Sequence, residues 1–131
     1  FAANFTLLGI HPGFGLSYTL PRLIGTQAAY DLFYTGRRVK GEEALALGLL
    51  DRLVPQNQVR AAAREKALEI AAAAPLAVMS VRQTLRGDLA ERVRAATAHE
   101  LEEQNRLLKT ADAREGVRAV AERRAGRFTG K

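Results

Sequence analysis

The sequence predicts a mainly α fold with one or two short strands. Beyond Pro55 the chain is rich in Ala, Leu, Glu, Lys and Arg, which are strong helix formers, and contains few residues that break helices. Before Pro55, short apolar segments alternate with glycines and prolines, as expected for short elements joined by turns. With 131 residues, of which 47% are hydrophobic, the chain is long enough to build one core.

The first element is an apolar run at residues 1–8, which predicts a strand that enters a turn at Gly9. Residues 9–15, GIHPGFG, place three glycines and a proline within seven residues. Such a loop reaches positive φ and allows close backbone approach, so it can face a ligand. The other elements predicted before Pro55 are helices at 16–24, 27–34 (with Thr26 as N-cap) and 42–47, an extended piece at 37–39 and a strand at 49–54.

Long helices are predicted beyond Pro55. In the last long helix, apolar residues recur at steps of three or four, which gives one apolar stripe. Glu100 and Glu103 interrupt this stripe, and we therefore expect the segment around them to face water or another subunit. The predicted helices are 59–73, 75–87 (starting at Pro75) and 89–107 (capped by Asp88).

A terminal helix is predicted from residue 112. Asp112 and Glu115 have the spacing of a capping box. In such a box the side chain of the N-cap residue accepts from the backbone N–H three residues later, and the Glu side chain there accepts from the N–H of the N-cap residue. Gly126 can end this helix, and we expect Arg127 and Phe128 to lie on a projecting tail.

Composition excludes several classes of function. There is no cysteine, which excludes disulfides, thiolate metal sites and thiol nucleophiles. No apolar run approaches the roughly 20 residues that span a bilayer, and no signal-peptide pattern is present, so we expect a cytoplasmic protein without membrane contact. The net charge of +6 comes from basic residues interleaved with acidic ones, which favours a solvated basic surface over a nucleic-acid partner.

Three groups of motifs point to one family. The run LLGIHPGFG at 7–15, followed by LPR at 20–22 and Gly25, resembles the pattern of the enoyl-CoA hydratase/isomerase (crotonase) family. The match continues in family order through TGRRV at 35–39, GLL at 48–50 and VP at 54–55. Near the end, D-x-x-EG at 112–116 and ERR at 122–124 with Phe128 are similar to the family's ending. The resemblance covers essentially the whole chain.

The resemblance implies a fold and a partition of the chain. Residues 1–55 correspond to the end of the family's ββα superhelix, and residues 56–131 to its C-terminal helical oligomerisation region. Family members form trimers that commonly pair into hexamers, so we expect a homo-oligomer. Because the chain opens at Phe1 directly in apolar sequence, we also expect it to be the later part of a longer protein.

The resemblance also implies acyl-CoA chemistry, by default the hydration of a 2-enoyl-CoA in fatty-acid metabolism. Coenzyme A would enter as part of the substrate, and no separate cofactor or metal is expected. Two backbone N–H groups stabilise the thioester enolate in the family, and these donors, like the first catalytic Glu, would precede Phe1. The second catalytic Glu of hydratases aligns with Phe5, which cannot transfer protons. We therefore expect the fragment alone to be inactive.

Candidate site residues lie at two places. By resemblance, Pro12 and Gly13 form a wall beside the acyl thioester, although a tight turn alone would also explain them. His11 is expected to make hydrogen bonds within the loop, with a role as catalytic base as the alternative.

The second place is the C-terminal tail. Arg124, Arg127 and Phe128 match a family tail that can reach the CoA of an adjacent subunit, and guanidinium groups suit phosphates. An ordinary frayed basic terminus is the alternative reading.

Other functions stay open at this point. Isomerisation, decarboxylation and thioester hydrolysis occur in the family with the same oxyanion hole but different side chains. A non-catalytic role as an oligomerisation module would need only the helices.

Overall fold

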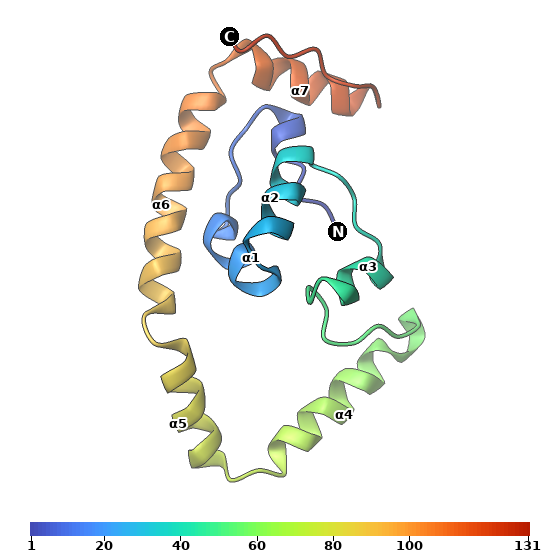
Figure 1. Ribbon diagram of the computed structural model, residues 1–131, viewed down its shortest axis with the longest axis vertical. Helices are drawn as coiled ribbons and strands as arrows, with labels where there is room; N and C mark the ends of the chain where they lie inside the picture. Colours follow the sequence, from blue (N-terminus) through green and yellow to red (C-terminus); the bar gives the residue numbers. More distant parts are fainter.

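A computed structural model describes all 131 residues, and its regular secondary structure is helical apart from one isolated β-bridge (Figure 1). The pair α1 and α2 lies at the centre with η1, α6 runs alongside α1, and α7 crosses above η1. The helices α4 and α5 extend away from this body. The bounds are η1 Thr6–Leu8, α1 Leu16–Ile24, α2 Thr26–Thr35, α3 Gly41–Ala46, η2 Gln56–Gln58, α4 Val59–Ala71, α5 Pro75–Arg86, α6 Leu89–Leu107 and α7 Ala111–Ala121.

The mainly α prediction is confirmed, and the predicted helices agree closely with the observed ones. Helices α1 and α6 have the predicted bounds, and α2, α3, α4 and α5 differ by one or two residues at an end. Helix α7 ends at Ala121, before the stop predicted at Gly126.

One predicted cap residue is wrong, and a second is correct in position but does not make the capping bond. Gly25, in a positive-φ conformation, is the N-cap of α2 in place of Thr26. Asp88 stands at the N-cap of α6, but its carboxylate pairs with Arg92 one turn later.

The main core gathers in the first fifty residues. Helix α2 contributes Ala29, Leu32 and Phe33, and Leu20 reaches them from α1. Ala3, Val39 and Ala44 complete the buried cluster. Burial of these apolar side chains is the main force that holds α1 and α2 together.

The predicted strand at 1–8 is wrong. Ala2 forms one isolated antiparallel bridge with Arg38, and Phe1 and Val39 exchange two backbone hydrogen bonds of 2.8 and 2.9 Å. The pairing stops there because the partner segment lies between two helices, α2 and α3, and has no room to lengthen. Residues Thr6–Leu8 then turn into η1.

The predicted strand at 49–54 is also wrong. The backbone N–H groups of Leu49 and Leu50 both donate to the carbonyl of Ala44, so the chain wraps around the end of α3. Both leucines are half-buried and pack against the main core. Because no neighbouring strand is available, the apolar side chains are buried by a loop.

The capping box predicted at Asp112 and Glu115 is replaced by a simpler cap. Thr110 lies in the extended region and its side-chain oxygen accepts from the N–H of Ala113 at 3.0 Å. A single hydroxyl therefore caps α7. The two carboxylates are left for other partners.

Small residues allow α7 to lie directly on η1. Ala113, Gly116 and Ala119 recur every three residues and are buried on one face of α7. A Cβ added to Gly116 would lie 2.4 Å from the backbone carbon of Leu8. The first and last parts of the chain thus meet through backbone contact.

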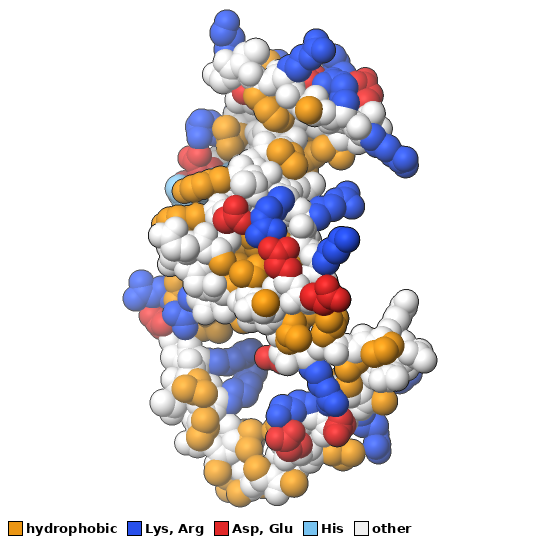
Figure 2. All heavy atoms as spheres, turned by 45° about the vertical axis from the view of Figure 1, so that its right-hand side comes forward, with side chains coloured by type: hydrophobic (Ala, Val, Ile, Leu, Met, Phe, Trp, Pro, Cys, Tyr) orange, Lys and Arg blue, Asp and Glu red, His pale blue; other side chains and the backbone are white.

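The helices α4 and α5 contain no buried residue. Their apolar side chains, among them Leu68, Ile70, Leu76 and Met79, are exposed. Hydrophobic and basic side chains mix over this part of the molecule (Figure 2). No helix of the chain combines the length and apolar character needed to cross a bilayer.

Substituting Gly116→Ala should destabilise the chain by about 1–3 kcal/mol, because overpacking against rigid backbone outweighs the better helix propensity of Ala. Val117→Ala on the exposed side of the same helix is the control and should change stability by less than about 0.5 kcal/mol. Chemical denaturation measures both. A Gly116→Ala protein as stable as the parent would contradict the close contact with Leu8.

Candidate functional site

The segment 9–15, called the glycine turn below, leaves η1 and enters α1. Its backbone is left-handed at three places: Gly9 at φ 69°, Phe14 at φ 65° and Gly15 at φ 71°. Positive φ is an outlier for a bulky residue such as Phe14 and has to be imposed by the surroundings. The side chain of Phe14 is 89% exposed. The turn therefore presents an aromatic ring to solvent from a constrained backbone.

A buried carboxylate from α6 holds the end of the glycine turn. Glu100 is only 1% exposed. Its Oε2 accepts from the N–H of Gly15 at 2.6 Å, and its Oε1 accepts from the N–H of Ser17 at 2.8 Å and from the Ser17 hydroxyl. The N-cap residue of α1 is Gly15, which has no side chain to cap the helix. Glu100 supplies the cap instead, and its charge lies at the positive end of the helix dipole.

This arrangement corrects one sequence-based expectation. Glu100 does not face water; it is the one charged residue buried inside the chain. Its partners are backbone N–H groups more than eighty residues earlier, and no local pattern reveals them.

A second side chain of α6 holds the start of the same segment. Gln104 donates from Nε2 to the carbonyl of His11 at 2.9 Å. It also lies so close to Gly13 that a Cβ there would sit 2.8 Å from Nε2. Pro12 and Gly13 are buried. Their role as a wall beside an acyl thioester stays a prediction.

His11 makes the hydrogen bond within the loop that the sequence suggested. Its Nδ1 lies 2.8 Å from the carbonyl oxygen of Pro12. A carbonyl only accepts, so Nδ1 donates in this hydrogen bond, and Nε2 is the ring nitrogen that would carry the lone pair in a neutral imidazole. The ring of His99 from α6 packs against it edge to face, with centroids 5.9 Å apart.

Phe5, which the family resemblance is expected to align with the second hydratase Glu, lies directly at the base of the glycine turn. Its carbonyl accepts from the N–H groups of Leu8 and Ile10 at 2.9 and 3.1 Å. Position 5 and the turn are thus tied together by backbone bonds, but the side chain at position 5 carries no titratable group. No group of three or more His, Cys, Asp or Glu residues is arranged to hold a metal ion.

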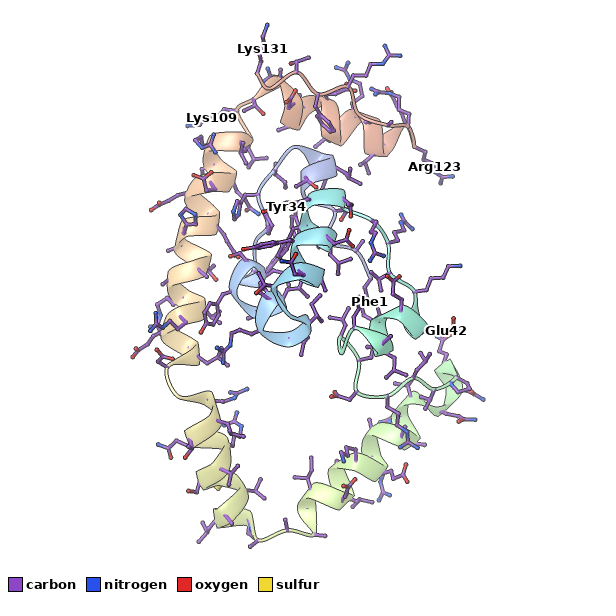
Figure 3. The ribbon with its side chains drawn as sticks, viewed as in Figure 1. Phe1, Tyr34, Glu42, Lys109, Arg123 and Lys131 are labelled. Carbon is purple, nitrogen blue, oxygen red and sulfur yellow. The ribbon has the colours of Figure 1, made fainter.

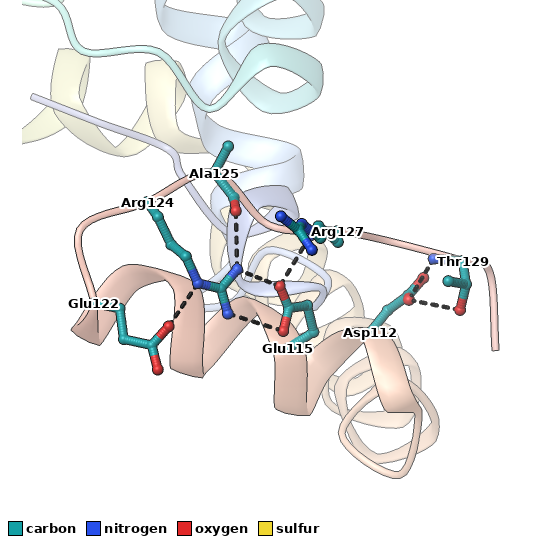
Figure 4. A network of polar contacts seen from close by, with 7 residues as sticks. All are labelled: Asp112, Glu115, Glu122, Arg124, Ala125, Arg127 and Thr129. Atoms are coloured by element: carbon teal, nitrogen blue, oxygen red, sulfur yellow. Dashed lines mark hydrogen bonds and ion pairs between the residues drawn. The ribbon is translucent and has the colours of Figure 1, made fainter.

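The C-terminal tail does not project, contrary to the sequence-based expectation. From Arg123 at the end of α7 it runs back to Lys131 near the start of the same helix (Figure 3). Asp112 accepts from the N–H groups of Thr129 and Gly130, both at 2.7 Å, and Glu115 accepts from the N–H of Arg127 at 3.0 Å (Figure 4). The two carboxylates that a capping box would have used hold the tail instead.

Within the tail, Arg124 is fully engaged. Its guanidinium group makes a bidentate pair with Glu115 and also contacts Glu122 and the carbonyl of Ala125 (Figure 4). The hydrogen bonds from Arg124 and from the N–H of Arg127 lower the pKa of Glu115 from 4.5 to about 2. The pKa of Asp112 is lowered mainly by the N–H of Thr129.

Arg127 is held only through its backbone. The ring of Phe128 lies against Gly126 and is 42% exposed. Of the three predicted CoA contacts, Arg127 and Phe128 have side chains that are free to meet a ligand, whereas Arg124 is already paired.

Helix α7 touches the start of the glycine turn and also holds the tail. A Cβ on Gly9, at the start of the glycine turn, would lie 2.7 Å from the backbone of Asp112. The carboxylate of Asp112 holds the tail. The residues that sequence reasoning missed are Glu100, Gln104 and Ser17; the one available signal was a carboxylate on the apolar stripe of α6.

Comparison with known proteins identifies the same family that the motifs indicate. A family model described as enoyl-CoA hydratase/isomerase matches residues 1–131. The short-chain-enoyl-CoA hydratase of Clostridium acetobutylicum is 33% identical over 89% of the chain and 45% of its own length. The carnitinyl-CoA dehydratase of Salmonella typhi is 33% identical over all of the chain and 52% of its own length.

The fold agrees with solved structures as well. The crystal structure of an enoyl-CoA hydratase/isomerase from Pseudoalteromonas atlantica superimposes with a TM-score of 0.83 at 32% identity, covering 95% of this chain and 50% of that one. The chain thus spans about half the length of the relatives it matches.

The docked tail should be released by acid. A lowered pKa means that docking favours the ionised carboxylates, so docking is at full strength above the ordinary value of 4.5 and weakens as the pH falls towards about 2. The amide NMR signal of Arg127, whose N–H donates to Glu115, should move with a midpoint well below 4.5 when it is followed from neutral pH downwards. Glu115→Gln should weaken docking at neutral pH, whereas Glu102→Gln, an exposed change on α6, should leave it intact. A midpoint at about 4.5 would contradict docking of the tail through Glu115.

Proposed function

The chain belongs to the enoyl-CoA hydratase/isomerase family, and from this we propose that the natural protein carrying it acts on acyl-CoA thioesters, by default hydrating a 2-enoyl-CoA. The observation that carries the proposal is the family match over residues 1–131, which includes the glycine turn. Relatives named as hydratase and dehydratase support the hydration of a carbon–carbon double bond.

The contribution of this chain to the reaction would be structural and local. The glycine turn would form one wall of the thioester site, with Pro12 and Gly13 beside the reacting group. The oxyanion hole and the first carboxylate would come from the half of the relatives that this chain does not match, so the chain alone is proposed to be inactive. Coenzyme A would enter with the substrate, and Arg127 and Phe128 would be free to contact it. A cytoplasmic location is part of the same proposal.

Double-bond isomerisation is the second candidate, and Phe5 favours it. Hydration in the two-carboxylate mechanism needs a titratable group at this position, and Phe has none. Isomerisation of a 3-enoyl-CoA needs one base, which removes a proton from C2 and returns it to C4 while the double bond moves from C3–C4 to C2–C3. The Nε2 lone pair of His11 is available for such a transfer.

A role in assembly belongs to the same proposal. The exposed apolar side chains of α4 and α5 need a covering surface, and we propose that they help hold a trimer or a dimer of trimers. A non-catalytic oligomerisation module would show the same assembly without turnover.

The two reactions are separated by assaying the natural protein with a 2-enoyl-CoA and a 3-enoyl-CoA. If His11 is the base of an isomerase, His11→Gln should lower kcat for the 3-enoyl substrate by about 100-fold or more. His99→Gln, which removes only the ring packed on His11, is the control and should retain most activity. Hydration that survives His11→Gln would assign the default reaction and exclude His11 as its base. Absence of turnover with either substrate would leave the assembly role alone.

Assembly is tested by light scattering on the natural protein. Met79 is 65% exposed on α5, and Met79→Glu should weaken association by at least about tenfold, because one buried Met side chain contributes roughly 1.5–3 kcal/mol. Ser80→Glu adds the same charge to the neighbouring position and should have a smaller effect. Equal assembly of all three proteins would place the interface elsewhere.

A further inference from the structure

Two side chains of α6 hold the glycine turn from one side. Glu100 and Gln104 stand four residues apart, which places them on the same face of α6, one helical turn from each other. Glu100 binds the N–H of Gly15 and Gln104 binds the carbonyl of His11. The segment 11–15 is therefore held at both of its ends by one rigid helix. We call Glu100 and Gln104 the α6 clamp.

The clamp acts on the part of the turn with the least favourable backbone conformation. Phe14 and Gly15 are consecutive left-handed residues, and Phe14 has no glycine-like freedom. The N–H of Gly15 belongs to the peptide bond between Phe14 and Gly15. Its hydrogen bond to the Glu100 carboxylate fixes this peptide and thereby the direction of the Phe14 ring. Val93 of α6 lies under Gly15, where a Cβ would sit 2.8 Å from its Cγ1, and blocks movement towards the helix.

The buried charge of Glu100 is tolerated because all its partners belong to this one place. A buried carboxylate without hydrogen-bond donors is strongly unfavourable, and here three donors from Gly15 and Ser17 surround it. Rotating the turn away would leave the charge unpaired. The carboxylate and the turn conformation therefore stabilise each other.

We propose that Glu100 and Gln104 are positioning residues for the reaction, locking the glycine turn so that its wall and the exposed ring of Phe14 stand in a fixed place beside the acyl thioester. This rests on the proposed function. The clamp touches neither substrate nor reacting atoms; it acts through the turn. A displacement of the wall of about 1 Å is enough to lower kcat by roughly 100-fold.

The test is Glu100→Gln, which keeps the size of the side chain but turns an NH₂ group towards the N–H of Gly15. Amide hydrogen exchange at Gly15 and Ser17 in this chain should rise by about tenfold or more, because a charge-assisted bond is lost. In the natural protein, kcat per folded molecule should fall by roughly tenfold to 100-fold, with KM changed by less than about threefold. Glu102→Gln, an exposed carboxylate on the same helix, should change neither.

A purely structural role would lower the melting temperature of Glu100→Gln and leave kcat of the folded protein unchanged, and that result would overturn the proposal. Gln104→Met leaves the Glu100 cap of α1 in place and should lower kcat without faster exchange at Gly15. If Glu100→Gln does not fold, the kcat of Gln104→Met therefore tests the positioning role. Exchange at Gly15 that matches the Glu102→Gln control would show that there is no clamp. Lack of turnover in the unaltered protein would instead remove the proposed function, and the exchange rates would still report whether the clamp exists.

Discussion

The bond between the Glu100 carboxylate and the N-terminus of α1 is the interaction on which the rest of the structure depends. It satisfies the first backbone donors of α1, which have no nearer side-chain cap. It also joins α6 to the first part of the chain, and α7 follows the C-terminal end of α6. A charge inside a protein is stable only when its donors are fixed in place, so this single carboxylate specifies how the two parts meet.

The glycine turn is enclosed by elements from the end of the chain. Helix α6 holds it at His11 and Gly15, and α7 lies against it at Gly9. The exposed ring of Phe14 lies between these fixed points. A loop that must reach positive φ at a bulky residue needs this kind of external support, because its own backbone prefers other conformations.

The family supplies the scaffold, while the side chains on it determine the chemistry. The fold and the glycine turn agree with enoyl-CoA hydratase relatives. At position 5, however, a phenylalanine without a titratable group stands at the base of the turn. In the tail, Asp112, Glu115 and Arg124 are used to fold the chain back. Of the three residues expected to contact CoA, Arg127 and Phe128 therefore keep free side chains.

The helices, the glycine turn and the family could be predicted from the sequence alone, because helix propensity and turn residues act between neighbours. Helices α1 and α6 were predicted to the residue for this reason. The strands at 1–8 and 49–54 could not be judged, because a strand exists only if a partner is available to pair with it. The burial of Glu100 and the path of the tail were likewise decided by the tertiary structure, since their hydrogen-bond partners lie many residues away and no local pattern encodes such distances.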